Sequence, residues 1–194
     1  VLLKETPEHA VIDYLCREGA APFGAIEEGG YHHYATYLKR QIQVEAEEKV
    51  PEGKMAKLLY DMYQPDCAKY AVESDVPQIY ELLLENFDLQ ADHIPSEDDL
   101  LQIVKEKEVM IYKIGDKIEC FFIYRREGKK LYCAFSYNHA SADILYSIER
   151  RVKEIEYEEN GIKMHYAWFN AENKKALRRN AWKDTKIRDY IFVK

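Results

Sequence analysis

Three strand-like runs follow one another directly in the second half of the chain, joined by turns too short for a crossover. Residues 108–114, 117–125 and 130–137 are rich in aromatic and β-branched side chains, and Gly115-Asp116 and Glu127-Gly128 separate them. Turns of this length connect neighbouring antiparallel strands. The sequence therefore predicts an antiparallel meander, which restricts the fold to those that contain one.

Helix and strand patterns alternate on both sides of the meander. Before it, a short strand (68–72) precedes a helix opened by Ser74-Asp75-Val76-Pro77 and a second helix capped by Ser96. After it, the pattern predicts a helix, a strand, a helix and a strand, over 141–159, 163–169, 172–182 and 187–193. The order from residue 68 is β-α-α-β-β-β-α-β-α-β, which indicates an α/β fold of the mixed (α+β) kind.

The first 67 residues are expected to be mainly helical. Two apolar sets have helical spacing: Val11, Ile12, Tyr14 and Leu15, then Tyr34, Tyr37, Leu38 and Ile42. A third helix is expected over 54–63, after the breaker Val50-Pro51-Glu52-Gly53. The predicted organisation is thus a helical segment (1–67) followed by a domain (68–194).

Composition excludes several classes of function. The net charge of −7 disfavours nonspecific nucleic-acid binding, which needs a basic surface. No window approaches ~18 consecutive apolar residues, so we expect no membrane span. The cysteines are scattered, which argues against disulfides and zinc and favours a reducing cytoplasm. His139 and the pair His32-His33 have no carboxylate or Cys at ligand spacing, so we expect no metal site.

The last 21 residues carry a local excess of positive charge. Only Asp184 and Asp189 oppose the basic residues Lys174, Lys175, Arg178, Arg179, Lys183, Lys186, Arg188 and Lys194. A basic patch on an acidic protein suits a small polyphosphate ligand. The alternative is a solvated helix face with no ligand.

The element order, together with two short motifs, resembles the GNAT acetyltransferases over residues 68–194. The motifs are Tyr137-Asn138-His139-Ala140-Ser141-Ala142, between a strand and a helix, and Asn173-Lys-Lys-Ala176. The resemblance implies that the pantetheine arm of acetyl-CoA, the co-substrate, lies along the strand that ends in Phe135, Ser136 and Tyr137. It also implies that the pyrophosphate sits on the N-terminus of the next helix, at Ala140, Ser141, Ala142 and Asp143.

The motifs depart from the family pattern at several positions. Ala140 stands where the family has its first glycine, and Tyr137 where it has Arg or Gln. In the second motif Asn173 matches and is expected to hold the cofactor arm, with Lys174 and Arg178 nearby in the chain. Asn180 replaces the family's tyrosine, and because Asn cannot act as a general acid, a nearby Tyr would have to replace it.

Two residues are candidates for proton transfer. Glu119 lies on a strand of the meander between apolar neighbours that could raise its pKa, and Tyr137 could line the slot. The alternative for Glu119 is a solvent-facing strand residue opposite a lysine.

Two functions follow from the resemblance: an acetyl-CoA-dependent N-acyltransferase for a small amine or amino-acid-like acceptor, or a GNAT-like binding module that has lost catalysis. A homodimer is kept as an alternative to a single chain.

Overall fold

The computed structural model describes residues 2–5, 10–46, 48–178 and 182–194. The chain forms two compact units. Unit 1 consists of Val1–Ile42, Asp88–His93 and Tyr166–Lys194, and unit 2 of Gln43–Phe87 and Ile94–His165.

Unit 2 is built on the predicted meander. Its strands are β4 (Lys69–Tyr70), β5 (Val109–Ile114), β6 (Lys117–Glu127) and β7 (Lys130–Asn138), in the order β7-β6-β5-β4 with antiparallel pairing throughout. Gly115 and Gly128 form the two turns with φ of 62° and 60°, a conformation that glycine adopts without steric cost. The meander prediction is confirmed.

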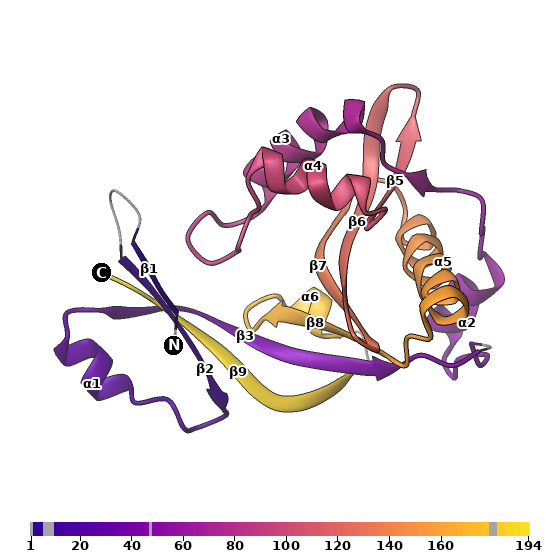
Figure 1. The fold of residues 1–194 in the computed structure, drawn as a ribbon. Helices are drawn as coiled ribbons and strands as arrows, with labels where there is room; N and C mark the ends of the chain where they lie inside the picture. The colour runs from indigo at the N-terminus through magenta and orange to yellow at the C-terminus, as the bar shows by residue number, and fades with distance from the viewer. Residues whose placement is uncertain (1, 6–9, 47, 179–181) are drawn as a thin grey trace. The chain divides into compact units, whose positions relative to one another are not determined.

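Helices cover both faces of this sheet (Figure 1). The 3₁₀ turn η1 (Glu73–Asp75), α3 (Val76–Asn86) and α4 (Glu97–Lys105) pack on the face that carries Phe121 and Ile123. The other face, with Cys120 and Phe122, packs against α5 (Ala142–Asn160). The remaining helix, α2 (Lys54–Asp61), contacts α5. Because successive side chains of β6 point to opposite faces of the sheet, β6 contributes to an apolar core under the helices on each side.

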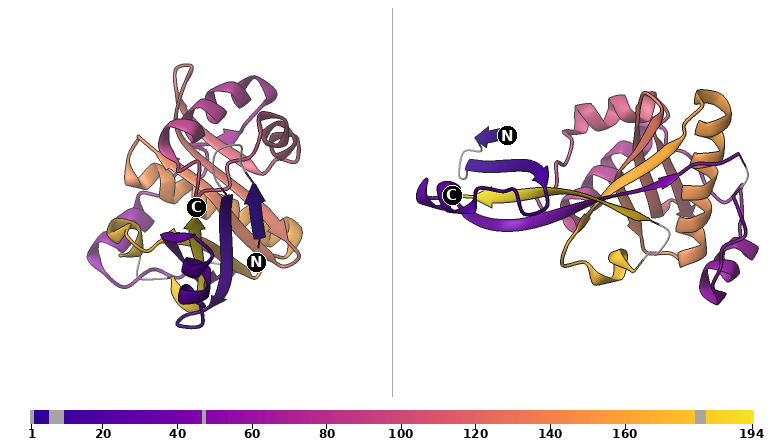
Figure 2. Two further views of the ribbon diagram at one scale, coloured as in Figure 1. Left: turned by 90° about the vertical axis from the view of Figure 1, so that its left-hand side faces the viewer. Right: turned by 90° about the horizontal axis from the view of Figure 1, so that it is seen from below.

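Unit 1 is a second set of strands, whose order is β1-β2-β9-β3-β8. Its elements are β1 (Leu2–Glu5), β2 (Ala10–Arg17), α1 (Phe23–Glu28), β3 (His32–Gln43), β8 (Met164–Asn170, of which Tyr166 onward belongs to this unit), α6 (Lys174–Leu177) and β9 (Lys183–Val193). Figure 2 shows the indigo β2 and the purple β3 as neighbours of the yellow β9, to which both pair antiparallel.

The expectation of a mainly helical start is wrong. Residues 10–17 and 32–43 are strands, and only the third expected helix, over 54–63, is found, as α2. In β2 the apolar and polar residues do not alternate in the usual way, because the polar Asp13 occupies a buried position. In β3 two bulges, at His33/Ala35 and Leu38/Arg40, change the strand's alternation, so its apolar residues are spaced as in a helix.

The element order predicted from residue 68 is confirmed, and it is that of a mixed α/β fold. The compact units nevertheless differ from the expected division into 1–67 and 68–194. The reason is that β2 and β3, from the start of the chain, pair with β9 at its end. Two of the expected lengths also change: α6 is a single turn, and β9 begins at Lys183 rather than near Ile187.

Candidate functional site

The strongest candidate site is the turn between β7 and α5 in unit 2. The backbone carbonyl of Glu119 accepts hydrogen bonds from the N–H groups of His139 (2.8 Å) and Ala140 (3.2 Å). The side chain of Asn138 donates to the carbonyl of Ser141 at 3.1 Å. These bonds fix the path of the chain from the end of the strand into the helix.

The side chain of Glu119 contacts two basic side chains beside this turn. Its carboxylate accepts from Lys117 Nζ at 2.8 Å and lies 2.7 Å from His139 Nδ1. The Glu119 side chain is only 11% exposed, whereas those of Lys117 and His139 are 63% and 67% exposed. Glu119 therefore anchors two basic groups that face solvent.

The pKa of Glu119 is shifted in the direction opposite to the one expected from the sequence. Hydrogen bonds from Lys117 and His139 lower the pKa of its carboxyl, and the same pairing raises the pKa of Lys117. The expectation that apolar neighbours raise this pKa is wrong, because both bonds stabilise the ionised form. Glu119 is thus a carboxylate near neutral pH.

The sequence analysis missed His139 and Lys117. His139 has no carboxylate at ligand spacing in the sequence, yet in the structure it contacts Glu119 across two strands. A β-bulge causes the contact. Tyr124 pairs with Cys133 but Ile123 pairs with Phe135, so Ala134 is an extra residue on β7. Without it Glu119 would lie opposite Asn138, and no signal in the sequence marks the bulge.

The predicted strand residues of the site lie on β7. Phe135 is buried and packs edge-on against Phe87, with ring centroids 5.0 Å apart, so its side chain belongs to the core. Ser136 is half-buried opposite Phe122. Tyr137 stacks on Phe121 at 5.4 Å between ring centroids, and its hydroxyl is close enough to Lys117 to raise the pKa of that lysine.

The remaining predicted residues of the turn lead into α5. Ser141 is its N-cap, but the Ser141 side chain makes no capping hydrogen bond. Ala142 is exposed and Asp143 is half-buried in the first turn, while Ala140 packs on the core under α5. A helix of 19 residues begins here, so its free N–H groups and dipole favour an anion.

The other predicted site residues belong to unit 1. Asn173 caps α6, since its Oδ1 accepts from the N–H of Ala176 at 3.0 Å, and Lys174 and Arg178 are exposed beside it. The structure confirms the helix start at Asn173, while its role toward a cofactor stays a prediction. Asn180 lies outside the described residues.

Part of the predicted basic patch is engaged in ion pairs. Arg188 is buried and makes two hydrogen bonds of 2.8 Å with Asp184 and one of 3.0 Å with Glu18. Lys186 lies 3.4 Å from carboxylate oxygens of both acids. These two cations pair with acids at the start of β9 and beside the end of β2, so they are not free to form a ligand surface.

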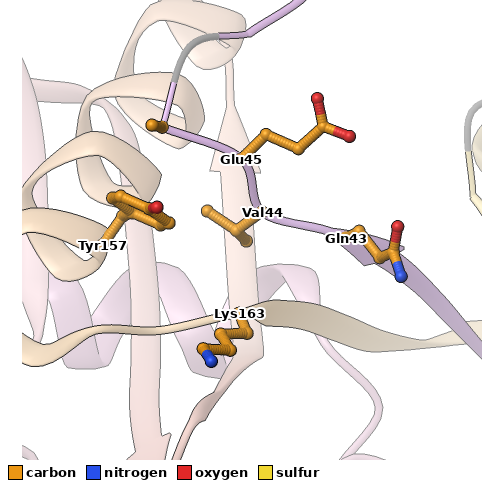
Figure 3. A pocket seen from close by; sticks show the side chains of 6 residues that line it. Gln43, Val44, Glu45, Tyr157 and Lys163 are labelled. Carbon is orange, nitrogen blue, oxygen red and sulfur yellow. The ribbon is translucent and has the colours of Figure 1, made fainter.

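A shallow hollow lies elsewhere in unit 2 (Figure 3). Gln43, Val44, Glu45, Ala46, Tyr157 and Lys163 line it. Tyr157 is near the C-terminal end of α5, roughly 22 Å along the helix from Ala142 at 1.5 Å per residue. The hollow is thus separate from the turn where the predicted residues gather.

Among the described residues no group of three His, Cys, Asp or Glu side chains is placed to hold a metal ion. No helix within the same residues is long and apolar enough to cross a membrane.

No model of a protein family matches the chain, and no curated protein matches it. Solved structures do match. A GCN5-related N-acetyltransferase from Sphaerobacter thermophilus has a TM-score of 0.65 at 15% identity, over 96% of this chain and 60% of that one. One from Kribbella flavida has a TM-score of 0.54 at 10% identity, over 93% and 42%. A functionally unknown conserved protein from Staphylococcus epidermidis has a TM-score of 0.60 at 8% identity, over 95% and 72%.

These likenesses show a fold. The predicted GNAT fold is confirmed, since several of the matching structures are GCN5-related N-acetyltransferases. The chain spans about 60% and 42% of the lengths of the first two.

Proposed function

We propose that this chain is an acyl-CoA-dependent N-acyltransferase that transfers an acetyl group to a small amine or amino-acid-like acceptor. The observation that carries the proposal is the turn between β7 and α5. There Lys117 and His139, both anchored by Glu119, stand beside the start of a long helix whose N-cap side chain makes no hydrogen bond.

The residues of this turn fit a phosphate group. Helix N–H groups attract an anion, and two exposed basic side chains add charge where the family's glycines and its Arg or Gln are missing. Asp143 opposes this with one negative charge in the first turn. Glu119 and Asp143 together offset the charge that Lys117 and His139 bring, so the attraction for an anion comes from the free N–H groups at the start of α5.

The proposed co-substrate would lie along this chain's own elements. We propose that Phe135, Ser136 and Tyr137 supply the strand backbone for the pantetheine arm. The N–H groups of residues 140–143 would then hold the pyrophosphate. For Asn173, Lys174 and Arg178 of unit 1, a role toward the cofactor is proposed from the resemblance alone. Acetyl-CoA supplies an acyl thioester to such a site: the amine forms an amide bond, the carbon–sulfur bond breaks, and the thiolate takes up a proton.

Glu119 and Tyr137 are the candidates for proton transfer that the sequence offers. We propose Glu119 as a positioning residue instead, because its pKa is lowered and its carboxylate holds Lys117 and His139 at the phosphate end of the slot. A carboxylate stabilised in this way is a weaker base. Tyr137 is kept as the proposed donor to the leaving thiolate, since Asn180 cannot fill that role.

A binding experiment separates the proposal from a fold without a ligand. Thermal unfolding is followed with coenzyme A or acetyl-CoA up to millimolar concentration, since a ligand of the native state raises its apparent stability. We expect a rise in Tm for the wild type and a smaller rise for Lys117→Ala combined with His139→Gln. Lys57→Ala, at an exposed site on α2, is the control and should behave as wild type. The absence of any shift in the wild type overturns the proposal.

A turnover experiment separates an enzyme from a degenerate binding module. Release of free thiol from acetyl-CoA is measured with a panel of small amines and amino acids. Thiol release that depends on an amine supports the acyltransferase. Binding of acetyl-CoA with no release for any acceptor favours the binding module, for which Ala140 and Asp143 in the phosphate turn are the structural arguments.

A further inference from the structure

Residues 88–93 lie on one face of the unit 1 sheet and are held there by three polar contacts. Tyr34 and Tyr37 of β3 donate to Asp88 (2.5 Å) and Asp92 (2.8 Å), and His93 Nε2 lies 2.8 Å from Asp13 Oδ2 on β2. In the same segment Ala91 is buried in an apolar cluster with Val11, Ile191 and Val193. None of these contacts belongs to the turn between β7 and α5.

The same sheet face carries a second carboxylate. Asp13 pairs with Ile191 and Leu15 pairs with Asp189, so Asp13 and Asp189 are diagonal neighbours across β2 and β9. Asp13 is 8% exposed, and the Oδ1 atoms of both acids are buried without a hydrogen-bond partner in the described part of the chain. Buried carboxylate oxygens are costly when unpaired, so this arrangement requires an explanation.

Other ionisable groups around the pair are mostly acidic or neutral. From β3, Tyr37 lies opposite Asp189, and from the 88–93 segment come Asp88, Asp92 and His93. On β2, burial raises the pKa of the Cys16 thiol most, and the nearby charge of Asp189 raises it further. Arg188 of β9 is engaged with Asp184 and Glu18. Among the described residues, His93 is the basic side chain in contact with Asp13.

We propose that Asp13 and Asp189 share one proton and, with His93, form a pH-sensitive latch that holds residues 88–93 on the unit 1 sheet. One proton between the two Oδ1 atoms gives each of them a partner. It also leaves the pair with a single negative charge beside the ring of His93. The inference is independent of acyl transfer.

The physical effect of pH on the latch has a definite sign. Burial first, and the charge of Asp13 second, raise the pKa of Asp189 to about 6. As the pH rises through that value Asp189 ionises, so a second buried negative charge forms beside Asp13. Release of residues 88–93 exposes this charge to water, so ionisation favours the open form. The latch is therefore closed on the acid side of neutrality and loosens on the alkaline side.

Hydrogen exchange of the segment measures the latch directly. The N–H groups of Asp88, Gln90 and Ala91 donate to carboxylates within the segment, so their exchange reports whether it is ordered. With a pKa of about 6 closed and about 3.9 open, the opening equilibrium should rise about tenfold between about pH 5 and 7.5. Exchange rates are corrected for the intrinsic effect of pH.

Three variants decide the proposal. Asp189→Asn provides a permanent N–H donor in place of the shared proton, so protection should become nearly independent of pH. Asp116→Asn, on the exposed turn between β5 and β6, should keep the wild-type dependence. Asp13→Asn removes the partner of His93 and should increase opening throughout the range. A wild-type profile without pH dependence overturns the latch, as does an Asp189→Asn profile that follows the wild type.

Discussion

Glu119 and His139 lie opposite each other across β6 and β7, with carboxylate and imidazole 2.7 Å apart and the backbone N–H of His139 bonded to the carbonyl of Glu119. The two residues therefore form both a backbone and a side-chain link at the place where β7 ends. Lys117 pairs with the same carboxylate of Glu119 and completes the group. This link decides how Glu119 would act in a transferase.

Replacing Glu119 by Gln tests whether it positions cations or removes a proton. The amide cannot accept charged hydrogen bonds from Lys117 and His139 as strongly, and both side chains are exposed, so the loss is modest. We expect the KM for acetyl-CoA to rise about two- to fivefold, with kcat nearly unchanged. Steady-state kinetics at several pH values provides the measurement. A large fall in kcat, together with loss of the acid limb of the pH profile, would identify Glu119 as the base instead.

Ala140 occupies the position of a family glycine without backbone strain. Among the described non-glycine residues only Lys107 and Lys186 have positive φ, so the turn does not need glycine for its conformation. We expect Ala140→Gly to lower the free energy of unfolding by about 0.5–1 kcal/mol, through unfolded-state entropy and lost packing. Urea unfolding checks the stability. If the methyl group narrows the phosphate cradle, calorimetry should show tighter coenzyme A binding in the same variant, and unchanged binding would remove that role from Ala140.

The fold of unit 2 could be predicted because its signals are local. Gly115 and Gly128 mark turns that the structure places between paired strands, and Ser96 caps α4 by accepting from the N–H of Asp99 at 3.2 Å. Such features depend on a few adjacent residues and on backbone sterics. The meander and the helix starts therefore followed from the sequence.

The contact of Glu119 with His139 could not be predicted, because it depends on a single extra residue in β7. Counting back from the hairpin at Gly128 places Glu119 opposite Asn138, and the bulge at Ala134 moves it to His139. A one-residue shift in register changes which side chains face each other. The bulge has no marker in the residues around it.

The strands of unit 1 were missed for a different reason. Asp13 occupies an inward position of β2, where an apolar residue would have revealed the alternation. Its partner strand β9 lies at the opposite end of the chain, so local patterns carry no information about the pairing. A polar residue at a buried strand position is often functional, and the latch proposed for Asp13 accounts for this one.

Tyr124 supports a buried carboxylate in unit 2. Its hydroxyl, fully buried, lies 2.9 Å from Glu156 Oε1 and 2.9 Å from the carbonyl of Lys107. Tyr124→Phe leaves these acceptors without that donor, so we expect a loss of about 1–3 kcal/mol in the free energy of unfolding. Urea denaturation measures it. Tyr112→Phe, at a half-buried site on β5, serves as the control and should cost clearly less. Equal losses would show that the hydroxyl of Tyr124 is not a stabilising donor.

Asp184 and Arg188 should make the stability of unit 1 sensitive to acid. The guanidinium makes two hydrogen bonds of 2.8 Å to the carboxylate, and these lower the pKa of Asp184 well below its ordinary value. The unfolded chain then binds a proton at higher pH than the folded one. The contribution is consequently present above the ordinary aspartate pKa and is lost as the pH falls below it.

We therefore expect the wild-type Tm to fall more steeply between about pH 5 and 3 than that of Asp184→Asn, which should be less stable at neutral pH and nearly equal at the acid end. Asp116→Asn controls for loss of an exposed carboxylate. Arg188→Lys keeps the charge but cannot form the two parallel bonds, so its acid dependence should be intermediate. Parallel Tm curves for the wild type and Asp184→Asn would show that the pair is not linked to proton uptake, and that Arg188 acts only through packing.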